Sequence, residues 1–258
     1  MDKPKNDSDA NAWLFYEKYY GKSLSYEDKK YTVGNTKILV NGDVCFNVKL
    51  KYDKRFTMLG SIIKKEPEPQ FNKLNELLSE LLYSPMNISI LPKTGGLNII
   101  KKNFADDRFD SFVWLISKYY EGVTAPIVNR GTQNAYICNQ LSLQEFLDEM
   151  DDENRFCLTF YGIPKEFVSK LIDSGKSAIR TYKEFYNFLL LATEFWEIRL
   201  KNLKKQNIIK EDEFKSYELI LNKLNELLKS NIDSIAEKSS VSSREYWKDN
   251  KDAVYQIF

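Results

Sequence analysis

The stretch GGLNIIKKNFADDRFD, residues 95–110, joins a glycine loop to the start of an amphipathic helix. Apolar side chains recur after it at the spacing of one helix face, which predicts a helix over about residues 107–120. The carboxylates of Asp106, Asp107 and Asp110 gather where this helix begins. Carboxylates in a first turn cap free N–H groups and meet the positive end of the helix dipole. This joint is where we expect the chain to carry out chemistry or to hold a partner.

The candidate functional surface around the joint consists of Asn98, Lys101, Lys102, Asp107, Arg108 and Asp110. Helix capping accounts for the aspartates without any function, and Arg108 would then pair with Asp106 or Glu145. The chemical alternative is a site in which Asp107, Asp110 and Asn98 hold Mg²⁺ or Mn²⁺ while the basic residues hold phosphate. Such a site suits a nuclease or a nucleotide-processing hydrolase. Otherwise we expect no cofactor.

The composition narrows the possible chemistry. The 258 residues include no histidine, which excludes Ser-His-Asp, Cys-His and His-ligated zinc sites. Lys and Arg (38) nearly balance Asp and Glu (37), so net charge does not favour nucleic acid or an acidic membrane. The three cysteines form no Cys-x-x-Cys motif and lie in apolar surroundings. No apolar run is long enough to span a bilayer. We therefore expect a cytoplasmic protein that is not bound to a membrane.

The N-terminal part is expected to form an aromatic helix and a β-meander. Residues 13–24 are expected to form a short helix that is ended by Gly21. Asn41-Gly42 between residues 36–40 and 44–50 indicates a tight hairpin, and residues 56–63 look like a third strand. The charged, proline-broken run at 64–69 is the best boundary. It separates residues 1–66 from a mainly helical part, 67–258, and the two form one continuous domain.

Helical spacing dominates the second part. The expected elements are helices from about residues 70 to 82, 142 to 150 and 164 to 175, with strands at 87–91 and 156–161. Ser142 and Gln144-Glu145 indicate a capping box for the second of these helices. Two long helices, 181–205 and 212–238, are joined by a short connector and should form an antiparallel pair. The predicted class is α+β: a small N-terminal antiparallel β unit packed on a larger helical part that ends in a long antiparallel helix pair.

The order of these motifs resembles a family of uncharacterised bacterial proteins classified only as a domain of unknown function. The best match is Asp107-Arg108-Phe109-Asp110 followed by Tyr119-Tyr120, with an apolar strand ending at Pro92 before it. A histidine of the family pattern is Glu17 here, and its Arg-Gly pair is Lys101-Lys102. The resemblance spans roughly residues 13–200 and implies a shared fold and surface, but no reaction.

The absence of a catalytic motif favours a non-enzymatic interaction or accessory protein, bacterial or phage-encoded, with a protein partner. A link to phage defence or a mobile element is a hypothesis by analogy. The first alternative is the metal-dependent hydrolase at Asp107 and Asp110. The second is nucleic-acid binding through Lys101, Lys102 and a basic patch at Lys201, Lys204, Lys205 and Lys210. An acidic group at residues 145–153 is interpreted as a solvated face, with a cation or basic partner as its alternative.

Overall fold

The computed structural model describes residues 2–27, 30–34, 37–48, 69–93, 97, 101, 107–122, 141–177, 179 and 182–235. Its N-terminal elements are α1 (Ala10–Tyr20), the 3₁₀ turn η1 (Gly21–Ser23), β1 (Leu24–Glu27), β2 (Lys30–Val33) and β3 (Ile38–Val44). These are followed by α3 (Pro69–Leu82), β4 (Ile88–Pro92), α5 (Phe109–Tyr120), α8 (Leu141–Glu149), α9 (Glu153–Tyr161), α10 (Lys165–Gly175), α11 (Tyr182–Lys205) and α12 (Glu211–Ile235).

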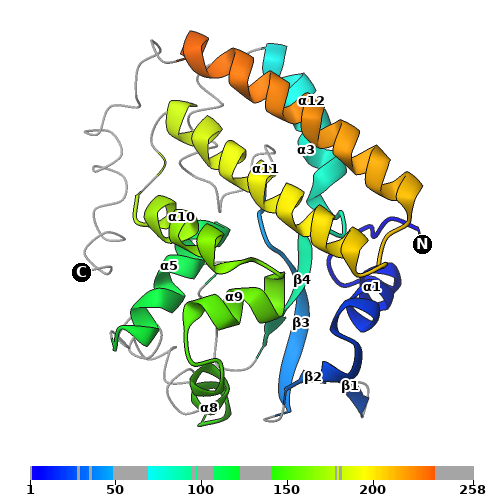
Figure 1. Cartoon of the computed structure of the whole chain (residues 1–258), viewed down its shortest axis with the longest axis vertical. Helices are drawn as coiled ribbons and strands as arrows, with labels where there is room; N and C mark the ends of the chain where they lie inside the picture. The colour runs from blue at the N-terminus through cyan, green and yellow to red at the C-terminus, as the bar shows by residue number, and fades with distance from the viewer. Residues whose placement is uncertain are drawn as a thin grey trace.

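The strands form a four-stranded antiparallel sheet in the order β1-β2-β3-β4. Helices cover it and make up the rest of the described fold, so the α+β prediction is confirmed (Figure 1). The long helices α11 and α12 lie side by side, as expected, and α3 lies beside α12. The last strand, β4, comes from beyond the expected boundary at residues 66 and 67. The β unit is therefore completed by the helical part of the chain.

The predicted hairpin at Asn41-Gly42 is wrong, because β3 runs straight through both residues. Gly42 is needed there for another reason. A Cβ atom on Gly42 would lie 1.8 Å from the carbonyl oxygen of Asp7, so the N-terminal segment passes directly over the strand. Gly34, which directly follows β2, has a φ of 73°, in the left-handed region that glycine adopts freely.

The expected strand at residues 156–161 is also wrong, since these residues belong to α9. Both ends of α9 carry strong helix signals. Asp152 accepts a hydrogen bond from the Arg155 N–H at 2.7 Å, and Gly162 ends the helix with a left-handed φ of 64°. The buried positions Phe156, Cys157, Phe160 and Tyr161 follow helical spacing. A short apolar run was mistaken for a strand because periodicity alone does not separate the two.

The other boundaries fall close to their predictions. The helices α1, α3 and α10 and the strand β4 occur where expected, and α1 ends at Gly21. The helix α8 already includes Leu141 and Ser142, so Ser142 lies inside the helix and not before it. The third strand expected at residues 56–63 lies outside the described residues.

One apolar core runs between the sheet and the helices. Its centre is aromatic: Phe46 of the segment after β3 lies against Phe109, Phe188, Phe195 and Trp196. The Trp196 indole donates to the Asn87 side-chain oxygen at 2.9 Å, which ties α11 to the turn before β4. Among the described helices, none is long and apolar enough to cross a bilayer.

Candidate functional site

Lys101 lies at the centre of a buried ionic cluster. Its ammonium nitrogen is 2.9 Å from Oδ1 of Asp107 and 3.5 Å from Oδ2 of Asp43, which is on β3. The side-chain amide of Asn47 donates to the other oxygen of Asp107, and the Asp107 N–H donates to the Lys101 carbonyl at 2.9 Å. Lys101 is only 1% exposed and Asp43 and Asp107 are also buried, whereas Asn47 is half-buried. We refer to Asp43, Asn47, Lys101 and Asp107 as the Lys101 cluster.

The electrostatics of the Lys101 cluster favour the charged form of Lys101. Burial by itself lowers the pKa of Lys101, because a dry environment disfavours the ammonium. The carboxylates of Asp43 and Asp107 outweigh this effect, and the pKa of Lys101 rises above its ordinary value. Asp107 also adopts a φ of 56°, a left-handed conformation that aspartate tolerates better than most residues. This backbone conformation holds its carboxylate against the ammonium.

Arg108 and Asp110 form a second buried group, which we call the α5–α10 clip. The guanidinium Nη2 of Arg108 is 2.7 Å from Oδ2 of Asp110, and its Nη1 donates to the Ser177 carbonyl at 2.8 Å. The Ser174 hydroxyl donates to the same Asp110 oxygen at 2.6 Å. The guanidinium lies over the Phe188 ring at 5.5 Å. These contacts connect the start of α5 to the end of α10.

The predicted capping role of the aspartates needs correction. The helix α5 begins at Phe109, two residues later than expected, and Arg108 is at its N-cap position without a side-chain capping bond. Asp107 lies before the helix and pairs with Lys101. Asp110 is in the first turn of α5, as expected, and pairs with Arg108. Arg108 does not pair with Glu145, which is exposed on α8, and Asp106 lies outside the described residues.

Four residues of the predicted functional surface are therefore not on the surface. Lys101, Asp107, Arg108 and Asp110 are all buried, and Asn98 and Lys102 lie outside the described residues. Asp107 and Asp110 also bind different cations and do not converge on one point. Among the described residues, no group of three or more Cys, Asp or Glu side chains is arranged to hold a metal ion.

Sequence reasoning missed Arg199, a third buried cation. Its Nη2 donates to the Ile88 carbonyl at 2.9 Å, and its guanidinium lies over the rings of Tyr19 and Phe195 at 5.4 and 5.8 Å. Its Nη1 approaches the Cys45 sulfur at 3.7 Å. The signal was present, because residue 199 falls on the inward stripe of α11, four positions after Phe195. Burial raises the pKa of the neighbouring Cys45 thiol to about 11 despite this cation.

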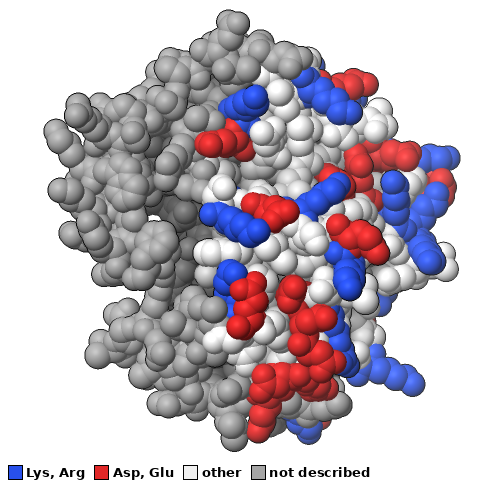
Figure 2. Space-filling view, turned by 60° about the vertical axis from the view of Figure 1, so that its left-hand side comes forward, with Lys and Arg blue, Asp and Glu red and all other residues white. Residues whose placement is uncertain are grey.

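The predicted charged patches are on the surface, but several of their side chains already have partners within the chain. Figure 2 shows acidic side chains gathered low on the described face, at the level of α8 and α9. There Asp152 caps α9, Asp148 accepts from the Tyr119 hydroxyl at 2.9 Å, and Asp151 pairs with Arg155. In the basic patch, Lys204 is 3.0 Å from Glu211 and lies over the Phe214 ring. In both patches, these contacts stabilise the ends of helices.

A stack of aromatic rings reaches the surface beside strand β1. Trp13 of α1 stacks on Tyr31 of β2 with ring centroids 3.8 Å apart and an angle of 6° between the planes. Tyr31 in turn contacts Tyr26 of β1 at 4.5 Å, and its hydroxyl donates to Glu17 at 2.8 Å. Tyr26, the last ring of the series, is 58% exposed. We call strand β1 with these three rings the aromatic edge.

Comparison of the chain with models of known families, with curated proteins and with solved structures finds no match. The geometry of the molecule therefore carries the functional argument.

Proposed function

We propose that this chain is a non-enzymatic interaction protein and that it binds a protein partner through the aromatic edge. The observation that carries the proposal is the exposure of Tyr26 at the end of a sheet. Large aromatic rings are enriched at protein interfaces, where they bury much area at a low cost in side-chain entropy. Contact with Tyr31, which itself stacks on Trp13, holds Tyr26 in place before any partner arrives.

The backbone of β1 supports the same surface. The pairing of β1 with β2 places Ser25 opposite Thr32 and Glu27 opposite Lys30, and the Gly34 N–H donates to the Ser23 carbonyl at 3.3 Å. In an antiparallel pair the residues that bond to the partner strand alternate with those that point away. Tyr26 belongs to the second set, so its N–H and carbonyl point outward. Within the described part of the chain, β1 is the end strand of the sheet.

An outward strand edge beside an exposed ring fits an extended peptide segment. Such a segment adds main-chain hydrogen bonds to the edge and places an apolar side chain against the neighbouring ring. Few features of β1 oppose this pairing, since it contains no proline and Ser25 to Glu27 are all exposed. We propose an extended segment of the partner, with an apolar residue opposite Tyr26, as the bound element.

The closed ion pairs argue against the alternative of a metal-dependent hydrolase. A Mg²⁺ ion at Asp107 or Asp110 would have to displace Lys101 or Arg108 from a buried carboxylate. Breaking a buried ion pair costs about 3–5 kcal/mol. A link to phage defence or to a mobile element is part of the proposal by analogy alone.

The test is affinity capture of the tagged chain from nuclease-treated extract of its own cells. We expect one protein to be captured in near-stoichiometric amount by the wild type and by Leu219→Ala, which removes an exposed apolar side chain from α12. Tyr26→Ala should lose the partner while its thermal midpoint stays unchanged. Equal capture by Tyr26→Ala, or metal-dependent nuclease activity that Asp107→Asn and Asp110→Asn abolish, would overturn the proposal.

A further inference from the structure

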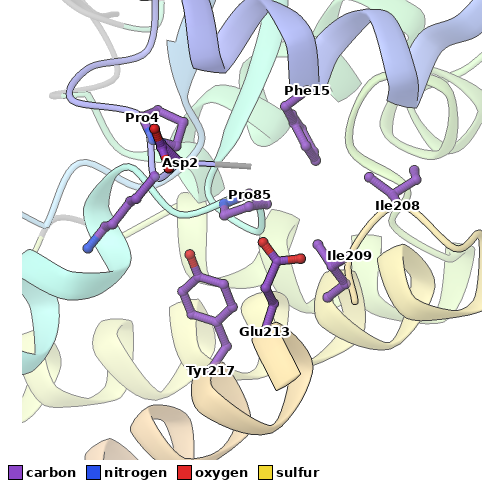
Figure 3. A pocket seen from close by; sticks show the side chains of 9 residues that line it. Asp2, Pro4, Phe15, Pro85, Ile208, Ile209, Glu213 and Tyr217 are labelled. Atoms are coloured by element: carbon purple, nitrogen blue, oxygen red, sulfur yellow. The ribbon is translucent and has the colours of Figure 1, made fainter. Parts of the chain in front are cut away.

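The pocket in Figure 3 lies between the N-terminal segment and the connector of α11 and α12. Phe15 and Pro85 are among the residues that line it, and Glu213 extends toward Pro85 from α12. The Glu213 carboxylate accepts the Lys210 N–H at 2.8 Å and has a further partner within the chain. This carboxylate is therefore committed internally, whereas the backbone of Tyr26 at the aromatic edge points outward.

The backbone of β1 is complementary to a second copy of itself at Tyr26. In an antiparallel ladder, the outward residues of two strands face each other and exchange both N–H···O=C bonds. The outward residues of β1 are Leu24 and Tyr26. The Leu24 N–H already donates to the Gly21 carbonyl at the end of η1. Within β1, a two-fold axis at Tyr26 is therefore the arrangement that uses an N–H and a carbonyl of each copy without breaking this bond.

The side chains of β1 agree with the same axis. Tyr26 shares a face of the sheet with Tyr31, which is directly opposite it on β2. A two-fold axis at Tyr26 places the two Tyr26 rings side by side, so that the series of rings continues into the second copy. On the other face, Glu27 of each copy lies opposite Ser25 of the other, whose hydroxyl can donate to the carboxylate. These pairs bring no like charges together.

From this complementarity we infer that the partner at the aromatic edge is a second copy of this chain, joined through β1 in an antiparallel pair centred on Tyr26. The inference rests on the proposed function and names its partner, so the captured protein is the untagged chain. The four-stranded sheets of the two copies become one continuous sheet. Such a contact is self-complementary and closes at two copies.

Sedimentation velocity of the purified full chain measures this association. One short strand and its rings form a small interface, and small interfaces belong to reversible complexes. We expect the average mass to rise from monomer toward dimer between about 1 μM and 1 mM. Tyr26→Ala should raise the dissociation constant about tenfold or more, because it removes the central ring. Tyr26→Phe keeps the ring, and Leu219→Ala changes an exposed residue of α12, so both should dimerise like the wild type.

Cysteine cross-linking tests the position of the two-fold axis. Residues that face each other across such an axis have Cα atoms about 5.5 Å apart, within the range of a disulfide. Tyr26→Cys should therefore form a linked dimer with oxidised glutathione. Two Leu24→Cys residues would be offset by about 14 Å along the strands and should not link. The wild type under the same treatment gives the background from the native cysteines.

A wild-type chain that stays monomeric up to about 1 mM overturns the inference. Linkage of Leu24→Cys in place of Tyr26→Cys also overturns it. If the monomeric chain still captures another protein, and Tyr26→Ala loses that protein, the proposed function stands while the second copy is ruled out as its partner. Capture and dimerisation that are both unchanged in Tyr26→Ala would overturn the inference and the proposed function together.

Discussion

At the scale of single residues, Lys101 is the buried cation that pairs with two buried carboxylates. Its ammonium pairs with both Asp107 and Asp43, at 2.9 and 3.5 Å. In Lys101→Met the aliphatic stem is retained, but two buried carboxylates lose the ammonium that pairs with both of them. We expect the free energy of unfolding to fall by about 3–5 kcal/mol, measured by urea denaturation.

The matched control is Lys201→Met, which makes the same change at an exposed position of α11. It should alter the free energy of unfolding by less than about 0.5 kcal/mol. A loss below about 1 kcal/mol in Lys101→Met would show that the cluster is open to water and that the carboxylates are solvated.

The same residues show what the sequence predicts about the candidate site and what it does not. The run at residues 107–110 was correctly identified as a place where charges gather at the beginning of a helix. Whether these charged side chains face solvent or the interior was not predictable, because the burial of a charged residue depends on partners distant in sequence. Asp43 is 58 residues from Lys101, and Ser174 is 64 residues from Asp110. A pattern within one helix contains no information on such partners.

At the scale of elements, the packing of α5 against α10 depends on Gly175. A Cβ atom there would lie 2.2 Å from the Asp110 carbonyl oxygen, so the two backbones are in direct contact. Alanine is favoured over glycine in a helix by about 1 kcal/mol, so without this contact Gly175→Ala would stabilise the protein. We expect the opposite sign, a destabilisation of about 1–3 kcal/mol by thermal or urea unfolding.

Lys176→Ala serves as the control for Gly175→Ala, since it removes only a surface ion pair with Asp173 at the neighbouring position. Its effect should stay within about 0.5 kcal/mol. An unchanged or raised stability in Gly175→Ala would mean that α5 and α10 are not packed as closely as the structure shows.

Glycine also explains where prediction of the elements succeeded and failed. Gly21 and Gly162 end α1 and α9 with positive φ, which is the usual role of glycine after a helix. At Gly42 the same residue type is required by the passage of Asp7 over β3. Local signals therefore located helix ends well, whereas a glycine that serves a long-range contact was misinterpreted as a hairpin. The long helices were predictable because their apolar stripes extend over many turns.

At the scale of the whole molecule, the buried cations and anions of the described residues are equal in number. Among the described residues they are Lys101, Arg108 and Arg199 against Asp43, Asp107 and Asp110. Among the described residues, the Lys101 cluster pairs one ammonium with two carboxylates, the α5–α10 clip pairs one guanidinium with one carboxylate, and Arg199 adds a further cation. Cys45 is close to these charges: its sulfur is 3.7 Å from Nη1 of Arg199, and Lys101 and Asp43 also act on its thiol. A thiolate at Cys45 would disturb this balance.

This arrangement predicts how the stability of the molecule depends on pH. Burial raises the pKa of Cys45 from 9 to about 11 in the folded protein. Between these values the unfolded chain loses the thiol proton while the folded chain keeps it, so the free energy of unfolding falls as the pH rises. Burial raises the pKa of Tyr20 and Tyr161 in the same direction, which extends the loss above pH 10. The contribution of Cys45 is complete below pH 9 and amounts to roughly 2–3 kcal/mol.

Urea unfolding from pH 8 to 11, followed by tryptophan fluorescence, measures this dependence. Cys45→Ala should lower the stability at pH 8 through lost packing, but its stability should decline less between pH 9 and 11 than that of the wild type. Val48→Ala removes buried volume nearby without a titrating group, so it should retain the full decline. Identical slopes in the two variants would show that Cys45 ionises as readily in the folded chain as in the unfolded one. The folded protein would then tolerate a thiolate beside its other buried charges.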